Sequence, residues 1–217
     1  MHLTLNVKGN SPPSLAALNP CSQSETQQPL PWAGEAKTAA QAVASGTTNA
    51  VFVLLPRELL ERVQLITPAF MEARGLQGLM LDIDNTLVPH GELGDVLALR
   101  DWLEPLRVAG IELRLVSNAL PRRITYFSIA LEIAAVGSGR TAGKPFPRAF
   151  RSAIREMQLE PHRVAMIGDQ VFSDVLGANL AGAYPILVRP LSDNSLPHTR
   201  VARALERLVL HRAGFDW

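Results

Sequence analysis

The chain has 217 residues, enough for one domain with an appendage, and 21 Lys and Arg against 20 Asp and Glu give it a formal charge of +1. A charge so close to zero provides no general attraction for nucleic acid, so nucleic-acid binding is not expected. The single cysteine has no second cysteine to pair with, and no apolar run reaches the roughly 20 residues that span a bilayer. We therefore expect a cytoplasmic protein.

The first 50 residues differ in composition from the rest. Residues 1–50 are rich in Ser, Pro, Gln, Thr, Ala and Asn and poor in large apolar side chains, so we predict a disordered, low-complexity extension. Residues 51–217 are predicted to form the folded domain. Its first helix is expected to have an apolar face that either packs on the domain or contacts a membrane surface. That face consists of Leu59, Leu60, Val63 and Ile66.

From Gly78 onward, apolar strand patterns alternate with helical patterns. After a first strand beginning at Gly78, strands are expected at residues 111–116, 133–136, 164–167 and 184–188. The helices are expected at residues 95–107, 121–132, 147–158, 173–182 and 196–211, and Pro105 is expected to kink or break the first of these. This alternation predicts right-handed βαβ units and one parallel five-stranded sheet in an α/β fold.

Two carboxylates follow the first strand of this sheet. Asp82 and Asp84 are two residues apart, so in strand geometry their side chains leave on the same side. Carboxylates brought together at the end of an apolar strand repel each other and lose hydration, so they require a cation or a shared proton. The alternative is turn chemistry, since Asp and Asn often end strands by bonding their own backbone.

Other polar residues lie where ligands bind in such sheets, beyond the carboxyl ends of the strands. Ser117 and Asn118 follow the second strand, and Asp169 follows the fourth. Lys144 precedes the helix between the third and fourth strands and is the only lysine after residue 37. A chain that otherwise uses arginine either needs a compact ammonium at this position or has this composition by accident.

These blocks resemble, in order and spacing, the motifs of the haloacid-dehalogenase-like (HAD) phosphohydrolase superfamily. The matching blocks are Asp82–Thr86, Ser117, Lys144 and Gly168-Asp169 with Asp174. Leu54-Leu55-Pro56 and Gly143-Lys144-Pro145 are further similar to subfamily IIIA, the YqeG-like group, whose mitochondrial and plastid relatives are phosphatidylglycerophosphate phosphatases. The resemblance implies a three-layer Rossmann-like HAD fold and a phosphatase.

The resemblance also implies a role for each matched residue. Asp82 would be the nucleophile that forms an aspartyl-phosphate, and Asp84 would protonate the leaving alcohol and then activate water. Lys144 would stabilise the nucleophile and the transferring group with its positive charge. Contacts to the phosphoryl oxygens would come from Thr86, Ser117 and Asn118.

A magnesium site is part of the same resemblance, because an all-oxygen site with retained waters suits a hard octahedral ion. The ligands of Mg²⁺ would be a carboxylate oxygen of Asp82, the backbone carbonyl of Asp84 and the carboxylate of Asp169. Asp174 would act through water or by orienting Lys144.

The motif spacing leaves no room for a cap domain. Residues 87–110 and 119–143 each hold one crossover helix with its strand, whereas a cap domain needs about 50 residues. An uncapped site favours a large substrate such as a lipid headgroup or a phosphoprotein. The resemblance favours phosphatidylglycerophosphate, and peripheral membrane contact would accompany that substrate. The alternatives are a phosphatase for soluble phosphometabolites or phosphoproteins, and a binding or assembly protein without turnover.

Several residues are given no catalytic role. His90 is expected to be a solvated loop histidine, and Gly137-Ser138-Gly139 needs no cofactor. The last helix is expected to pack an apolar side on the core and to expose its arginines, with attraction to anionic lipid as the alternative. The apolar side consists of Val201, Leu205, Leu208 and Val209, and the arginines are Arg200, Arg203, Arg207 and Arg212.

Overall fold

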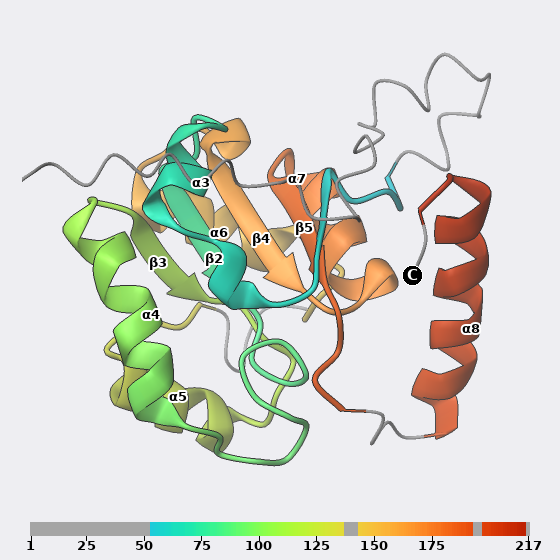
Figure 1. The fold of residues 1–217 in the computed structure, drawn as a ribbon, viewed down its shortest axis with the longest axis horizontal. Helices are drawn as coiled ribbons and strands as arrows, with labels where there is room; N and C mark the ends of the chain where they lie inside the picture. The colour runs from blue at the N-terminus through green and yellow to red at the C-terminus, as the bar shows by residue number, and fades with distance from the viewer. Residues whose placement is uncertain (1–52, 137–142, 193–196, 216–217) are drawn as a thin grey trace, which may run out of the picture. The chain divides into compact units, whose positions relative to one another are not determined.

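The computed structural model describes residues 53–136, 143–192 and 197–215, which belong to one compact unit spanning residues 37–217 (Figure 1). The predicted disordered extension at residues 1–50 and the run Gly137-Ser138-Gly139 lie outside the described residues. None of the described helices is long and apolar enough to cross a membrane.

A five-stranded parallel sheet forms the centre of the fold, as the sequence predicts. Its strand order is β1-β5-β4-β2-β3. The strands are β1 (Glu58–Leu60), β2 (Gly78–Leu81), β3 (Glu112–Leu115), β4 (Val164–Gly168) and β5 (Tyr184–Val188). Every residue of β2 and β4 is buried, as expected of central strands covered on both faces. The neighbouring carboxyl ends of β2 and β4 are therefore held side by side.

Two predictions of secondary structure were wrong. Leu59 and Leu60 were expected in a helix with Val63 and Ile66, but Glu58–Leu60 form β1, because pairing with β5 satisfies their backbone groups. Within that predicted helix only Val63–Leu65 is helical, as the short 3₁₀ turn η1. Residues 133–136 were expected to form a strand, but only Ala135 bridges to Leu115 of β3. The sheet thus gains its fifth strand at the β5 edge and not beside β3.

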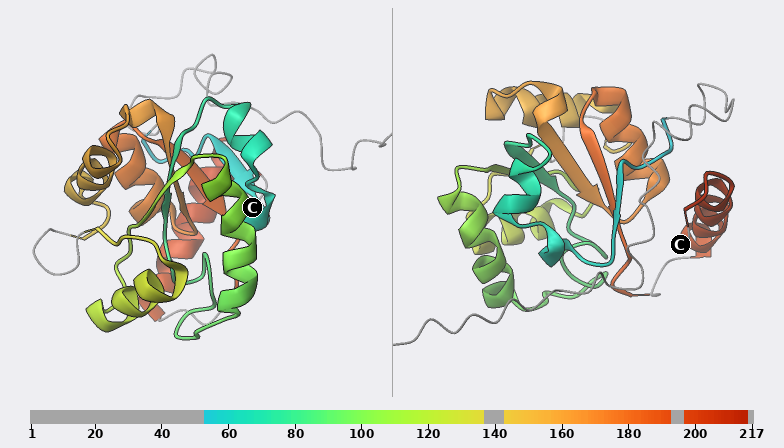
Figure 2. Two further views of the ribbon diagram at one scale, coloured as in Figure 1. Left: turned by 90° about the vertical axis from the view of Figure 1, so that its left-hand side faces the viewer. Right: turned by 45° about the horizontal axis from the view of Figure 1, so that its top comes forward.

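Helices cover both faces of the sheet. The helical segments after η1 are α3 (Pro68–Glu72), α4 (Val96–Val108), α5 (Pro121–Leu131), α6 (Pro147–Met157), η2 (Pro161–Arg163), η3 (Val171–Val175), α7 (Leu176–Ala181) and α8 (Pro197–Arg212). Leu79 and Leu81 of β2 pack against α3, α4 and α5, whereas Met80 between them packs against α6 and α7. The left view of Figure 2 shows α3 and α4 on one side of the sheet and α6 and α7 on the other.

Two helices differ in detail from their predictions. Pro105 does not break α4, which continues to Val108, because Leu103 and Leu106 on either side of the proline are buried in the core. The helix predicted at 173–182 begins at Val171 as the π-helical turn η3, which places Asp174 inside the fold.

The prediction for α8 was correct in its extent but wrong in its orientation. Leu205 and Leu208 are exposed, while Glu206 and Leu210 are buried. Leu210 packs on the apolar side chains of η3 and β5, so the orientation of α8 follows a contact that periodicity alone does not specify. Arg203, predicted to lie in solvent, is turned inward instead, with its side chain 13% exposed.

Candidate active site

Three buried carboxylates converge at the carboxyl ends of the central strands. Asp82 follows β2, Asp169 follows β4, and Asp174 lies in η3. Each offers one oxygen, and these oxygens all lie within 4.8 Å of one another. Adjacent parallel strands end at the same edge, which is why residues so far apart in the sequence meet here. The structure therefore brings together Asp82, Asp169 and Asp174.

Lys144 provides the cation inside this cluster. Its Nζ lies 2.6 Å from Asp82 Oδ1 and 2.6 Å from Asp174 Oδ1, and its side chain is 3% exposed. Burial alone would lower the pKa of Lys144, but the charges of Asp174 and Asp82 outweigh burial and raise that pKa above its usual value. The lysine is thus a fixed positive charge beside the predicted nucleophile.

Asn118 holds the backbone of Lys144 in place. The Lys144 amide donates to Asn118 Oδ1 at 2.8 Å, and Asn118 Nδ2 donates to the Lys144 carbonyl at 3.0 Å. A Cβ on Gly143 would lie 2.5 Å from that same Oδ1, so only glycine fits before the lysine. The observed contacts of Asn118 are therefore with the lysine segment, whereas its sequence-predicted partner was the substrate.

Asp174 is held on both of its oxygens. Oδ1 accepts from Lys144, and Oδ2 accepts from the backbone amide of Gln170 at 3.1 Å. A Cβ at Gly168 would lie 2.0 Å from Asp174 Cγ, so the close approach requires glycine at this position. These contacts suit a residue that orients Lys144, one of the two roles expected for Asp174.

The two carboxylate oxygens of Asp169 differ in their hydrogen bonding. Its Oδ2 accepts from Arg203, whereas Oδ1 is buried and has no hydrogen-bond partner among the described residues. Burial raises the pKa of Asp169 to about 6, against the opposing charge of Arg203, and burial raises the pKa of Asp174 to about 7, against Lys144. An unpartnered carboxylate oxygen in an all-oxygen cluster suits a divalent metal ion, whose charge would keep these carboxylates ionised.

The second carboxylate of the first motif, Asp84, faces the open side of the site. Asp82 and Asp84 both line one pocket of about 720 Å³. Arg123 donates from Nε to Asp84 Oδ1 at 3.0 Å, and Arg123 Nη2 lies 2.9 Å from the same oxygen. His90 Nδ1 lies 3.5 Å from Asp84, and this half-exposed side chain also lines the pocket.

Sequence reasoning missed Arg123. The signal was available, because Arg123 lies in the first turn of α5, which starts just after Ser117 and Asn118 at the carboxyl end of β3. Arg123 also donates to the backbone carbonyl of Glu92, which ties the loop after the first motif to α5. The arginine therefore fixes Asp84 from outside the matched motifs.

Replacing Arg123 by Gln is expected to lower kcat for phosphate release by about 10²-fold, because a misplaced acid–base group loses its reacting geometry. Steady-state kinetics at saturating substrate measures this effect. Arg123→Lys should recover part of the loss, since it keeps the charge but not the paired nitrogens. A wild-type kcat in Arg123→Gln would show that the contact with Asp84 does not matter for turnover.

Two of the three residues predicted to bind the phosphoryl oxygens line the pocket, and Thr86 is not among them. Ser117 and Asn118 line the pocket, and Ser117 Oγ accepts from the backbone amide of Ala119 at 3.2 Å. Thr86 is buried, and within the described parts of the chain nothing bonds its Oγ1. Between β2 and β3 the described chain contains α4 and no other helix, which leaves the pocket without a cap from that segment.

Comparisons with known proteins identify relatives of this chain. Residues 141–195 match the Hydrolase_like family model, described as HAD-hydrolase-like. The chain is 36% identical over 156 residues to "Probable phosphatase YqeG" of Bacillus subtilis, which covers 72% of this chain and 89% of that protein. It is 33% identical over 114 residues to a phosphoserine phosphatase of Thermus thermophilus, covering 46% of this chain and 44% of that protein.

A solved structure of an uncharacterized protein from Listeria monocytogenes serotype 4b is also similar, with a TM-score of 0.42 and 23% identity over 63% of this chain and 99% of that one. The stronger finding is the sequence match to the Bacillus subtilis phosphatase, which spans most of both chains. On that match, the chain belongs to the YqeG family of HAD-like phosphatases and is a phosphoric monoester hydrolase.

Proposed function

We propose that the chain is a Mg²⁺-dependent phosphatase of HAD subfamily IIIA that acts through an aspartyl-phosphate on Asp82, and that its substrate is phosphatidylglycerophosphate. The observation that carries the reaction class is the convergence of Asp82, Asp169 and Asp174 around Lys144. A pure binding protein has no need for a buried cluster of carboxylates, which is costly to fold.

In the first step, a carboxylate oxygen of Asp82 attacks phosphorus and the bond from phosphorus to the leaving alcohol breaks. Asp84, held by Arg123, gives its proton to the departing alkoxide, which leaves as the alcohol. Lys144 keeps Asp82 in place and offsets negative charge that builds up on the phosphoryl oxygens. Ser117 Oγ, which lines the pocket, would bond those oxygens, and the unpartnered Thr86 Oγ1 is the second hydroxyl proposed for this role.

In the second step, water attacks the phosphorus of the aspartyl-phosphate, and Asp84 takes up the proton that water loses. The bond between phosphorus and the Asp82 oxygen breaks, which releases phosphate and restores the free carboxylate. Mg²⁺ held by Asp82, Asp169 and the Asp84 carbonyl would supply charge neutralisation for the phosphoryl group in both steps. Asp174 keeps Lys144 in position throughout.

The outer part of the pocket supports a large anionic substrate with an apolar portion. Leu93 and Leu120 line it and are 53% and 62% exposed, and Tyr126 beside them is 40% exposed. Arg122 adds a positive charge to the same lining. An apolar rim with arginines suits the headgroup region of an anionic phospholipid, which supports peripheral contact with a membrane surface. A cytoplasmic location is part of the same proposal.

The proposal is tested by measuring phosphate release with Mg²⁺ from a panel of substrates. The panel contains phosphatidylglycerophosphate in detergent micelles, phosphoserine, sugar phosphates, nucleotides and a phosphopeptide. The expected result is that phosphatidylglycerophosphate has the highest kcat/KM and that chelation of the metal stops its hydrolysis. The Asp82→Asn protein is assayed beside the wild type as an inactive control. Phosphate that this variant still releases does not come from the proposed site.

Each other outcome selects an alternative. A higher kcat/KM for a soluble phosphate ester or for the phosphopeptide would reject the lipid substrate and keep the reaction class. Turnover that persists in the presence of a chelator would reject the dependence on Mg²⁺. Absence of turnover with every compound would favour a binding or assembly role for this fold.

A further inference from the structure

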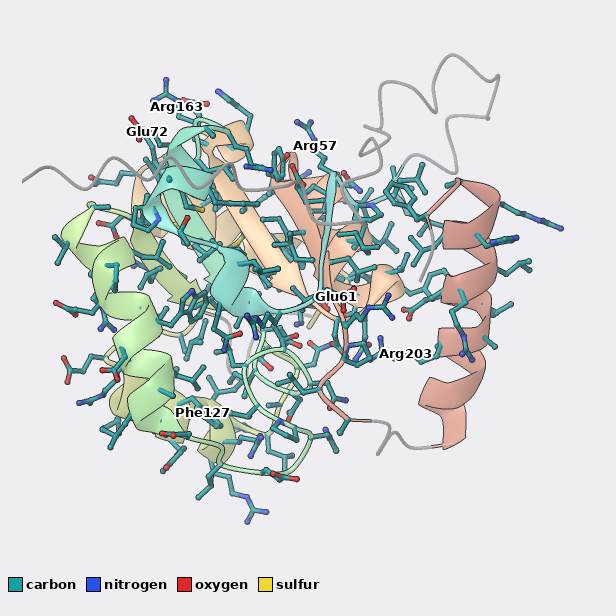
Figure 3. All side chains as sticks on the ribbon, in the orientation of Figure 1. Arg57, Glu61, Glu72, Phe127, Arg163 and Arg203 are labelled. Atoms are coloured by element: carbon teal, nitrogen blue, oxygen red, sulfur yellow. The ribbon has the colours of Figure 1, made fainter. Side chains whose placement is uncertain are left out.

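The C-terminal helix α8 reaches the metal-binding carboxylates through one arginine. Arg203 donates from one guanidinium nitrogen to Asp169 Oδ2 and from another to the backbone carbonyl of Asp169. Arg203 lies on the side of α8 that faces the sheet (Figure 3). This helix follows the region of residues 78–188 in which the motifs lie, so the contact adds a part to the site that the motifs do not contain.

The arginine is itself held by a buried carboxylate on the same helix. Glu206 is 2% exposed, and its Oε2 lies 3.6 Å from a nitrogen of Arg203. Its Oε1 accepts from the backbone amide of Phe172 in η3 at 3.3 Å. Glu206 thus connects α8 to the turn that carries Asp174. Because Glu206 contacts both Arg203 and the backbone of η3, the guanidinium of Arg203 is held in place beside Asp169.

The two oxygens of Asp169 have different surroundings. Oδ2 is taken by Arg203, whereas Oδ1 is buried without a partner in the described part of the chain. Asp169 also contributes an oxygen to the cluster with Asp82 and Asp174. A carboxylate bonded on one oxygen by a planar guanidinium has its plane fixed, so its second oxygen points in a set direction.

We propose that Arg203 is a positioning residue for the metal site, which fixes the Asp169 carboxylate so that Oδ1 is presented to the divalent ion. This inference rests on the proposed function, because it concerns the same site. On this proposal α8 contributes to the phosphatase site, in addition to packing on η3 and β5. Arg203 does not touch the reacting atoms, so its effect is on the affinity for the ion.

The test is a calorimetric titration of the full-length protein with Mg²⁺ alone, without substrate. Arg203→Gln is expected to weaken Mg²⁺ binding by about 10–100-fold, the effect typical of losing a partner of a metal ligand. Arg203→Lys should lose less, since it keeps the charge but cannot bond two acceptors in one plane. Arg207→Gln is the matched control, because Arg207 lies one turn further along α8 and is exposed; it should bind Mg²⁺ as the wild type does.

A kinetic measurement separates positioning from a general structural defect. As the Mg²⁺ concentration is raised, phosphate release by Arg203→Gln should approach the wild-type kcat, with only the apparent KM for Mg²⁺ increased. A kcat that stays low at saturating Mg²⁺ would contradict positioning of the ligand. If Arg203→Gln does not fold, Arg203→Lys decides, because an unchanged Mg²⁺ affinity in that folded variant would overturn the proposal.

Two further results have distinct meanings. Wild-type affinity in a folded Arg203→Gln protein, or tighter binding because the arginine competes with the ion, would overturn the role of Arg203 and leave the proposed function intact. Absence of Mg²⁺ binding by the wild-type protein would instead overturn the proposed magnesium site, and the role of Arg203 with it.

Discussion

Replacement of Asp82 by Asn is expected to lower kcat for phosphate release by about 10⁴-fold or more, because the nucleophile of a two-step reaction cannot be bypassed by the remaining residues. Asn has nearly the same size and can still accept a hydrogen bond from Lys144, which lies 2.6 Å from Asp82. The loss should therefore occur in a folded protein. Phosphate release with the preferred substrate of the panel measures it, with circular dichroism as the check of folding.

Asp101→Asn is the matched control for this substitution. Asp101 is an exposed carboxylate on α4, so its replacement removes the same charge from the chain without altering the site. Its kcat should equal that of the wild type. An Asp82→Asn protein that keeps a tenth or more of the wild-type kcat would contradict a nucleophilic role, and the carboxylate would then serve only the metal.

Replacement of Lys144 by Met is expected to destabilise the metal-free protein by about 3–5 kcal/mol, the range seen when one partner of a buried ion pair is removed. The physical reason is that Asp82 and Asp174, both nearly inaccessible, would lose the cation that they share. Urea unfolding in the presence of a chelator measures the change as a lower midpoint at an unchanged m-value. Turnover should be lost as well, since the fixed charge is removed.

Two further variants isolate the cause of that destabilisation. Arg148→Met removes an exposed cation from the start of α6 and should change the free energy of unfolding by less than about 0.5 kcal/mol. The double variant Lys144→Met with Asp174→Asn should be more stable than Lys144→Met alone, because one of the unpaired carboxylates is gone. If Lys144→Met unfolds at the wild-type urea concentration, the cluster is not held by this lysine.

The central strands and the cluster at their ends are the parts that the sequence predicts well. The apolar run from Gly78 to Leu81 is a short buried strand, and the polar residues after it necessarily lie at the strand's carboxyl end. Because β2 and β4 are neighbours, the same argument brings Asp169 close to Asp82. Such inferences need only local pattern and the rule that parallel strands end at one edge.

The parts that were missed depend on long-range packing. The three-residue strand β1 exists because it pairs with β5, more than 120 residues later in the chain, and its own sequence favours a helix equally well. Arg203 was expected in solvent because the apolar positions of α8 indicate the wrong face; its contact with Asp169 depends on how Leu210 packs on η3 and β5. Neither contact has a signature in the local sequence.

The covalent state of Asp82 during turnover tests the account most directly. The enzyme is stopped with acid while it hydrolyses the preferred substrate, and the peptide that contains Asp82 and Asp84 is analysed by mass spectrometry. Asp84→Asn is analysed beside the wild type, because loss of the general base slows hydrolysis of the intermediate while loss of the general acid slows its formation. The account predicts a phosphoryl group on Asp82. Turnover without any phosphoryl group on this peptide, or with the group on Asp84, would contradict it.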